Sequence, residues 1–458
     1  MLSRRHVLAS AAAAAVLPAG AAYGDARRRP LAIERVTLAS AQADKPALPD
    51  ALIVVRDGKI EYAGPRAGRS TPSDAKRIDG QGKWAIPALI DMHVHAPQLG
   101  LASGRNVAAD PRTAAQDALL PYLANGIQAV FNLSGTVDTM ALGAMTAAGF
   151  VDGPAIINAA LIDGSPPVRP GTRVAATAEA ARAWVSDIAY EGYRFVKVYS
   201  RLELNVLAAI IDEARKQNLR VVGHIPNSAR GQIEKALVPG FDMVAHAEEF
   251  AKQSPELSDA DISRFAALSR ASGTKLIATL TCFEWIARQT RSVASLDSLD
   301  AMKYLPAAVR NEWRAGNPYA RNSTPERIER FDRFVDFHRR LVKAFRVAGV
   351  PVLAGTDSMI PGLVPGFSLH DELESLVAAG ISSNEALAAA TVEASAALGL
   401  ADTGVLEAGK RANILLLDAD PNADIRNSRR INGFVREGAW IARADLDKRL
   451  AGLAKRNA

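Results

Sequence analysis

Two histidines separated by one residue, His93 and His95, end an apolar run that begins at Ile86. Side chains alternate along a β-strand with a period of two, so both imidazoles would lie on one face of such a strand. From that face they could bind one metal ion together. They could equally be two ordinary histidines that hydrogen-bond at a strand end, because short metal motifs also occur by chance.

Four further residues that can bind a metal or transfer a proton lie within or at the ends of other apolar runs. Each has an ordinary explanation by itself: a strand-end histidine is usually hydrogen-bonded, a buried lysine can pair with a carboxylate, and an aspartate can cap a turn. One metal site would explain all of them together with His93 and His95. The four are Lys197, His224, His246 and Asp357.

These residue types indicate hydrolytic chemistry on metal ions. Imidazoles and carboxylates are suitable ligands for Zn²⁺ and similar divalent ions, and no thiolate is needed. Burial near cations would favour the uncharged form of Lys197. An uncharged amine can add carbon dioxide to form a carbamate, whose two oxygens could bridge two metals. A hydroxide shared by the two ions could then attack a carbonyl carbon or a phosphorus.

The middle of the chain alternates strand-like and helix-like stretches, which is typical of βα units and a parallel sheet. Eight strands are expected, the number that a (β/α)8 barrel requires, and the candidate residues fall at their C-terminal ends, where the active sites of such barrels lie. The expected strands are residues 86–95, 127–133, 155–160, 195–200, 220–225, 243–246, 275–281 and 350–357.

Both ends of the chain contain short strands and tight turns instead, such as Asp57-Gly58 and Glu437-Gly438. We therefore expect an α/β fold, a (β/α)8 TIM barrel with a small β-sandwich domain built from both the N- and C-terminal segments. The expected boundaries are residues 30–85 and 403–446 for the two parts of the β-sandwich, 86–402 for the barrel, and 447–458 for a C-terminal tail.

Residues 1–26 have the pattern of an export signal. Arg4 and Arg5 precede an alanine-rich apolar run that ends near Leu17, and small residues follow it. The arginine pair resembles the twin-arginine type, so we expect a periplasmic or secreted protein. An uncleaved N-terminal anchor is the alternative; nothing later reaches 18 uninterrupted apolar residues. Export that is unchanged when both arginines are replaced by lysine would contradict the twin-arginine assignment.

The overall composition excludes little but guides the choice of partner. Of the 458 residues, 48% are hydrophobic and 23% charged, which are ordinary globular values. The net charge of +6 is not accompanied by a long basic tract, so a small-molecule substrate is favoured over a nucleic acid. The single cysteine, Cys282, excludes an internal disulfide and a multi-cysteine metal site, and we expect it to be buried. A homo-oligomer is compatible with the sequence.

At these residues the chain resembles the amidohydrolase superfamily, and within it the imidazolonepropionase-like and prolidase-like metal-dependent hydrolases. The resemblance covers nearly the whole mature chain and departs from the usual pattern at Ala88, where glycine is common, and at Asn413, where aspartate is common. It is carried by residues 90–95, 196–198, 223–224, 246, 355–358, 366–370, 372–373, 379–380, 385–387, 390–391, 404–417 and 420–421.

The resemblance implies two divalent metal ions, expected to be Zn²⁺, bridged by a carbamate on Lys197. It also implies that Asp357 takes a proton from the bridging water and passes it to the leaving group. The implied ligands are His93, His95 and Asp357 for the more buried ion, and His224 and His246 for the more exposed one.

Other polar residues near the motifs are open to two interpretations. Tyr199 shares the face of Lys197 and could polarise a bound carbonyl, or it could be a core tyrosine. His370 opens a helix beyond the last strand and could act in catalysis, support the site or cap the helix. His338 is expected to be structural, and Glu248 and Glu249 are expected to be solvated.

The expected function is hydrolysis of an amide-type C–N bond, in a dipeptide, an N-acyl amino acid or a cyclic amide, by attack of a metal-bridging hydroxide. A mononuclear deaminase on the same barrel is one alternative, but it would not use Lys197 and usually carries an acid shortly after the fifth-strand histidine. A lactone, ester or organophosphate hydrolase would use the same two metals. A metal-free interaction protein is disfavoured because all six ligand positions hold competent residues.

The sequence does not identify the substrate-binding residues. Specificity is expected to come from the loops at residues 99–112, 163–173 and 288–322, the last of which is predicted to be irregular. Arg169, Arg173 and Arg201 could each receive a substrate carboxylate.

Overall fold

The computed structural model describes residues 29–458 except 40, 42–44, 96–109, 169–171 and 322. The expected export signal, Arg169 and most of the 99–112 loop therefore lie outside the described residues. Among the residues that are described, no helix is long and apolar enough to cross a membrane.

Eight strands form a nearly closed parallel barrel, which confirms the predicted fold. The first and last strands meet where Val94 and Ser358 form a parallel bridge, and the His95 amide donates to the Ser358 carbonyl at 2.8 Å. The strands follow one another in chain order around the barrel: β6 (Leu89–Val94), β7 (Ile127–Asn132), β8 (Ala155–Asp163), β10 (Phe195–Val198), β11 (Arg220–Gly223), β12 (Phe241–Ala245), β13 (Lys275–Ile277) and β14 (Val352–Leu353), with the short β9 (Arg173–Val174) paired to β8.

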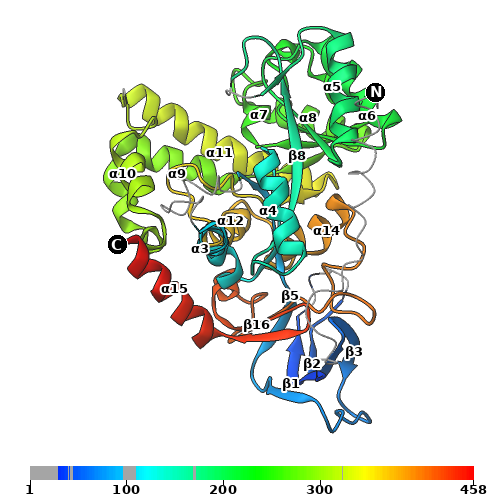
Figure 1. The fold of residues 1–458 in the computed structure, drawn as a ribbon. Helices are drawn as coiled ribbons and strands as arrows, with labels where there is room; N and C mark the ends of the chain where they lie inside the picture. The colour runs from blue at the N-terminus through cyan, green and yellow to red at the C-terminus, as the bar shows by residue number, and fades with distance from the viewer. Residues whose placement is uncertain (1–28, 40, 42–44, 96–109, 169–171, 322) are drawn as a thin grey trace, which may run out of the picture.

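Helices cover the outside of the barrel (Figure 1). Their sequences supply the apolar face that parallel strands need on their outer side. The helices are α3 (Pro111–Ala124), α4 (Val137–Ala147), α5 (Ala178–Tyr190), α6 (Leu204–Lys216), α7 (Glu248–Ala251), α8 (Asp259–Ser272), α9 (Leu280–Arg291), α10 (Ala307–Ala315), α11 (Pro325–Val347), α12 (Phe367–Ala378), α13 (Ser383–Ala389) and α14 (Val392–Leu398).

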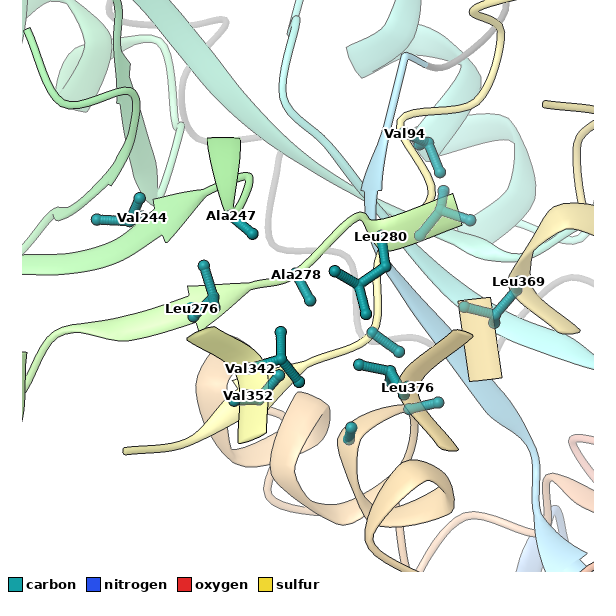
Figure 2. Packing of buried hydrophobic residues seen from close by; sticks show 14 of the residues in the cluster. Val94, Val244, Ala247, Leu276, Ala278, Leu280, Val342, Val352, Leu369 and Leu376 are labelled. Carbon is teal, nitrogen blue, oxygen red and sulfur yellow. The ribbon is translucent and has the colours of Figure 1, made fainter. Parts of the chain in front are cut away.

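Figure 2 shows how strands and helices are held together near the last three strands. Val244 of β12, Leu276 of β13 and Val352 of β14 belong to one buried cluster with Val342 of α11 and Leu376 of α12. Burying each such side chain contributes about 2 kcal/mol. This packing holds in place the strands that lead into His246 and Asp357.

The two ends of the chain build one eight-stranded sheet beside the barrel, as predicted. Strand β5 pairs with β15 in antiparallel register, so Ile86 lies opposite Leu415 and joins the two segments. In Figure 1 the blue strands of the first segment lie below the orange and red strands of the second. The strands are β1 (Leu31–Leu38), β2 (Leu48–Arg56), β3 (Lys59–Pro65), β4 (Lys76–Asp79), β5 (Trp84–Pro87), β15 (Ile414–Leu417), β16 (Ile431–Arg436) and β17 (Ala439–Ala442).

Both predicted hairpin turns are confirmed. Asp57 and Gly58 connect β2 to β3 with φ angles of 49° and 76°, and Glu437 and Gly438 connect β16 to β17 with φ angles of 47° and 80°. Two successive positive φ angles match the right-handed twist of the flanking strands. The turns therefore fix the register of the sheet.

The two departures from the family pattern lie next to each other, at the junction of the sheet and the barrel. The Ala88 amide donates to the Asn413 carbonyl at 3.0 Å. The side chain of Gln128 joins them, because its Nε2 donates to the Ala88 carbonyl and its Oε1 accepts from Asn413 Nδ2 at 3.0 Å. An aspartate at position 413 could not donate this hydrogen bond, so asparagine suits the glutamine here.

Two predictions about local structure were wrong. The seventh strand, expected to reach residue 281, ends at Ile277, and α9 begins at Leu280, so the buried Cys282 lies in a helix. The 288–322 segment is not irregular, because it contains the end of α9, η4 (Val293–Ser298), η5 (Asp300–Tyr304) and α10. Separately, residues 447–457 of the expected tail belong to helix α15 (Arg443–Asn457), where Arg456 Nε donates to Asp117 Oδ2 of α3 at 3.0 Å.

His338 is buried in α11, as the structural interpretation requires. Its ring lies 4.9 Å from that of Phe283, centre to centre, and neither ring nitrogen has a hydrogen-bond partner in the described part of the chain. Burial lowers the pKa of His338 from 6.5 to about 3. The folded state thus keeps this imidazole neutral at a pH where the unfolded chain protonates it.

We expect His338→Leu to lose less stability than the wild type at acid pH. A buried neutral histidine makes its full contribution to the free energy of unfolding above pH 6.5. This contribution declines as the pH falls toward 3, because only the unfolded state takes up the proton. Between pH 7 and pH 5 the variant should lose about 2 kcal/mol less than the wild type in urea unfolding. Phe334→Leu, on the same helix, is the control, and an unchanged pH dependence in His338→Leu would contradict the assignment.

Candidate active site

The structure brings the six residues predicted from the sequence to one end of the barrel. The rings of His93 and His246 lie 4.5 Å apart, and those of His224 and His246 lie 5.1 Å apart, centre to centre. His95 Nε2 is 2.8 Å from Asp357 Oδ1, and His93 Nε2 is 3.2 Å from the same oxygen. The sixth residue, Lys197, places its Nζ 3.5 Å from His93 Nε2.

The first and last strands hold His93 and Asp357 in place through a buried aspartate that the sequence analysis did not single out. Asp91 accepts hydrogen bonds from the amides of His93 and Thr356, at 3.2 and 3.0 Å, and from the Thr356 hydroxyl at 2.7 Å. Gly355 makes this close approach possible, since a Cβ there would lie 2.9 Å from the His93 backbone nitrogen. Burial raises the pKa of Asp91 to about 7 against these hydrogen bonds.

Two of the six residues have unusual backbone conformations that direct their side chains inward. Met243 and Ala245 of β12 face the barrel interior, so the next residue of a regular strand would face outward. His246 instead has a φ of 79°, and its ring joins the cluster. Asp357 has a φ of 61°. Left-handed conformations are costly for non-glycine residues and occur most often at functional sites.

The charge states at this site suit a metal. Burial and Lys197 lower the pKa of His93 to about 3, and burial lowers the pKa of His224 and His246 well below the ordinary range. Burial raises the pKa of Asp357, but His93 and His95 outweigh it and hold that pKa well below its ordinary value. Neutral imidazoles and an ionised carboxylate are the forms that bind divalent ions.

Unused donor atoms at the site also fit a metal. His93, His246 and Asp357 each offer one ligand atom, and these atoms lie within 4.8 Å of one another. Among the described residues, His93 Nδ1 and His224 Nε2 are buried without a hydrogen-bond partner. Buried polar atoms are normally paired, so such atoms in a cluster of imidazoles indicate a missing ligand.

Comparison with known proteins agrees with this geometry. The model of the Amidohydrolase family matches residues 84–441, which include the whole barrel and all six clustered residues. The chain belongs to the amidohydrolase family. The match also includes β5, β15 and β16 of the adjoining sheet, so it covers the connection between the two domains.

Individual relatives of this amidohydrolase support the same assignment. The imidazolonepropionase of Rhizobium meliloti (strain 1021) is 28% identical over 408 residues, which are 82% of this chain and 87% of that protein. A solved structure from Bifidobacterium longum, described provisionally as a prolidase, is 25% identical with a TM-score of 0.69, and the match covers 94% of this chain and 100% of that one.

A third comparison concerns the fold alone. The bottromycin amidohydrolase has a TM-score of 0.72 at 23% identity, over 93% of this chain and 91% of that one. Taken together, family and relatives identify the chain as an enzyme, a hydrolase of amide-type C–N bonds that uses divalent metal. They do not favour the deaminase alternative.

Of the two further catalytic candidates, the structure brings only Tyr199 to the site of the amidohydrolase. Its ring centre lies 4.0 Å from that of His224 and 5.4 Å from Lys197 Nζ. His370 is buried in α12, where its Nδ1 pairs with Ser428 Oγ at 2.9 Å, in η6 (Ile425–Arg429) of the other domain. Within the described part of the chain, the hydrogen bond of His370 is therefore made at the domain junction and not with the clustered residues.

The prediction that Glu248 and Glu249 are solvated was wrong for Glu249. The short helix α7 follows His246 directly and turns back toward β11, which buries the Glu249 carboxylate completely. Its Oε1 lies 3.0 Å from His224 Nδ1, and Lys252 Nζ donates to the same oxygen at 2.7 Å. An acid three residues after His246 was the only sequence signal of this contact.

The two described arginines among the substrate-binding candidates both have partners within the chain. Arg173 pairs with Glu191 at 2.5 Å. Arg201 Nη1 donates to the Pro166 carbonyl at 2.6 Å, and its amide donates to Asp163 at 2.9 Å. Both residues thus stabilise loops on this face of the barrel.

Proposed function

We propose that this amidohydrolase holds two divalent ions, expected to be Zn²⁺, and hydrolyses the amide bond of a dipeptide, an N-acyl amino acid or a cyclic amide. When bound, such ions lower the pKa of water and polarise a carbonyl oxygen. The more buried ion would be held by His93, His95 and Asp357, and the more exposed one by His224 and His246.

The observation that carries the two-metal proposal is the position of Lys197. Its side chain is 1% exposed and ends beside His93, among imidazoles that are themselves neutral. A lysine has no use in the mononuclear site of a deaminase. Addition of carbon dioxide to the uncharged amine would release one proton and give a carbamate, which would supply negative charge and two oxygen ligands for two cations.

The side chains divide the remaining chemistry between them. Asp357 would take a proton from the attacking water and deliver it to the nitrogen of the leaving group, because its carboxylate contacts both His93 and His95. The Tyr199 hydroxyl would donate a hydrogen bond to the carbonyl oxygen as that oxygen gains charge. The buried walls around them would exclude bulk water.

The test is a hydrolysis screen of dipeptides, N-acyl amino acids and cyclic amides. Protein stripped with a chelator should lose more than about 100-fold in rate, and Zn²⁺ should restore it. The matched control is protein passed through the same steps without the chelator. Hydrolysis that persists in the stripped protein, release of ammonia from an amine, or cleavage of esters and lactones alone would contradict the proposal.

We also propose export to the periplasm or beyond, on the pattern of Arg4, Arg5 and the apolar run that follows them. An enzyme that obtains its metal in the cytoplasm would suit an export route that carries folded proteins.

A further inference from the structure

Glu249 makes an unusual set of contacts for a residue outside the proposed ligands. Its carboxylate is fully buried, yet three donors surround it. Oε2 accepts the Ile225 amide at 3.0 Å, while Oε1 faces both His224 Nδ1 at 3.0 Å and Lys252 Nζ at 2.7 Å. One carboxylate thus contacts both the backbone that follows β11 and the ring of His224.

This contact favours the form of His224 that carries its proton on Nδ1. Nδ1 lies 3.0 Å from both Glu249 Oε1 and the hydroxyl of Ser200. A hydroxyl can accept or donate, but an ionised carboxylate can only accept, so the carboxylate favours the single N–H of a neutral imidazole on Nδ1. The lone pair is then on Nε2, which is buried without a hydrogen-bond partner in the described part of the chain. The carboxylate therefore leaves the metal-binding atom of the ring uncommitted.

Lys252 makes the buried charge of Glu249 tolerable. Its Nζ also contacts Glu248 Oε2 at 3.3 Å, so one ammonium lies between two carboxylates of the same short helix. A buried carboxylate without such a partner would be strongly destabilising. Only one of the two carboxylates reaches His224, because Glu248 is partly exposed and has no contact with the ring among the described residues.

Both histidines proposed for the exposed ion have a hydroxyl beside Nδ1, but only His224, whose hydroxyl partner is Ser200, also has a carboxylate there. His246 Nδ1 pairs with the hydroxyl of Thr279 at 2.9 Å. A hydroxyl orients the ring but carries no charge, whereas a carboxylate also raises the basicity of the imidazole it accepts from. The two ligands of one ion would therefore differ in donor strength, with His224 the stronger.

We propose that Glu249, supported by Lys252, is a positioning residue that fixes the Nδ1–H form of His224 and sets the affinity of the more exposed metal ion. This inference rests on the proposed two-metal function. It predicts that loss of the Glu249 charge weakens one ion and spares the other, which a residue needed only for folding would not do.

The experiment titrates chelator-stripped protein with Co²⁺ against a chromophoric competitor, and follows the visible spectrum of the bound ion. Glu249→Gln keeps the size of the side chain and an acceptor for the Ile225 amide but removes the charge. We expect it to weaken the second Co²⁺ by about 10- to 100-fold and to leave the first within about threefold. Glu248→Gln, which also removes a carboxylate from Lys252, is the matched control and should bind both ions like the wild type.

Each other result contradicts the inference. Unchanged binding of the second ion in Glu249→Gln would show that the carboxylate does not act through His224. Equal weakening of both ions, or a matching effect in Glu248→Gln, would make the cluster a structural ion pair. A wild type that binds a single ion refutes the two-metal function itself, and this is read from the wild-type titration alone before any variant is compared.

Discussion

Lys197→Ala is expected to lower kcat/KM by more than about 100-fold and to reduce the bound metal from about two ions per chain to about one. The side chain is buried beside His93, so alanine would remove the group proposed to carry the carbamate, and with it the negative charge that would offset the repulsion between two cations. Loss of a residue that only supports a ligand already costs 10- to 100-fold, so loss of a bridging ligand should cost more.

Short carboxylic acids should restore part of the activity of Lys197→Ala, because a free carboxylate can occupy the space of the carbamate. The control is Lys275→Ala, since Lys275 begins β13 at the opposite end of a barrel strand. Lys275→Ala should keep its metal and its rate. Full activity of Lys197→Ala with one tightly held ion would favour a mononuclear site and contradict the account.

Asp357→Asn is expected to lower kcat by about 10³-fold. Asparagine has the same shape, but it cannot take up a proton from water or pass one to a leaving nitrogen. The native carboxylate is ionised and therefore has a free site for a proton, because His93 and His95 keep its pKa well below the ordinary value although burial opposes the charge. Steady-state kinetics with the best substrate of the screen, together with metal content, measure the effect.

Metal content separates the two proposed roles of Asp357. A rate that falls while both ions remain would identify proton transfer as the main role, and a parallel loss of metal and rate would identify ligation. Asp336→Asn is the control, because Asp336 is an exposed residue of α11 that pairs with Arg340. An Asp357→Asn variant that keeps a tenth or more of the wild-type rate would exclude both roles.

The barrel could be predicted because its strands are short apolar runs that end in polar residues of distinctive type. All eight predicted strands are present, and their order brings Lys197, His224 and His246 to one end of the barrel, although the ring of His246 reaches the cluster only through its left-handed backbone. Strand ends were less predictable. The apolar run from Leu276 to Cys282 reads as one strand, but periodicity over so few residues cannot distinguish a strand from the first turn of a buried helix.

Residues that support the cluster could not be predicted, because their positions depend on where the chain turns after each strand. Glu249 reads as part of a solvated acidic pair, yet α7 turns it beneath His224. His370 lies in a matching motif, yet the packing of α12 directs it to Ser428. No sequence pattern indicated Thr279, whose hydroxyl contacts His246 from a left-handed backbone with a φ of 49°.

We propose that one amide-hydrolysing site holds two ions. The most direct test adds metal back to chelator-stripped enzyme and measures, by mass spectrometry, the metal-to-protein ratio at which the hydrolysis rate is restored. The account predicts that the ratio approaches about two divalent ions per chain, with the hydrolysis rate still rising as the second ion binds. Full hydrolytic activity at one ion per chain would contradict it.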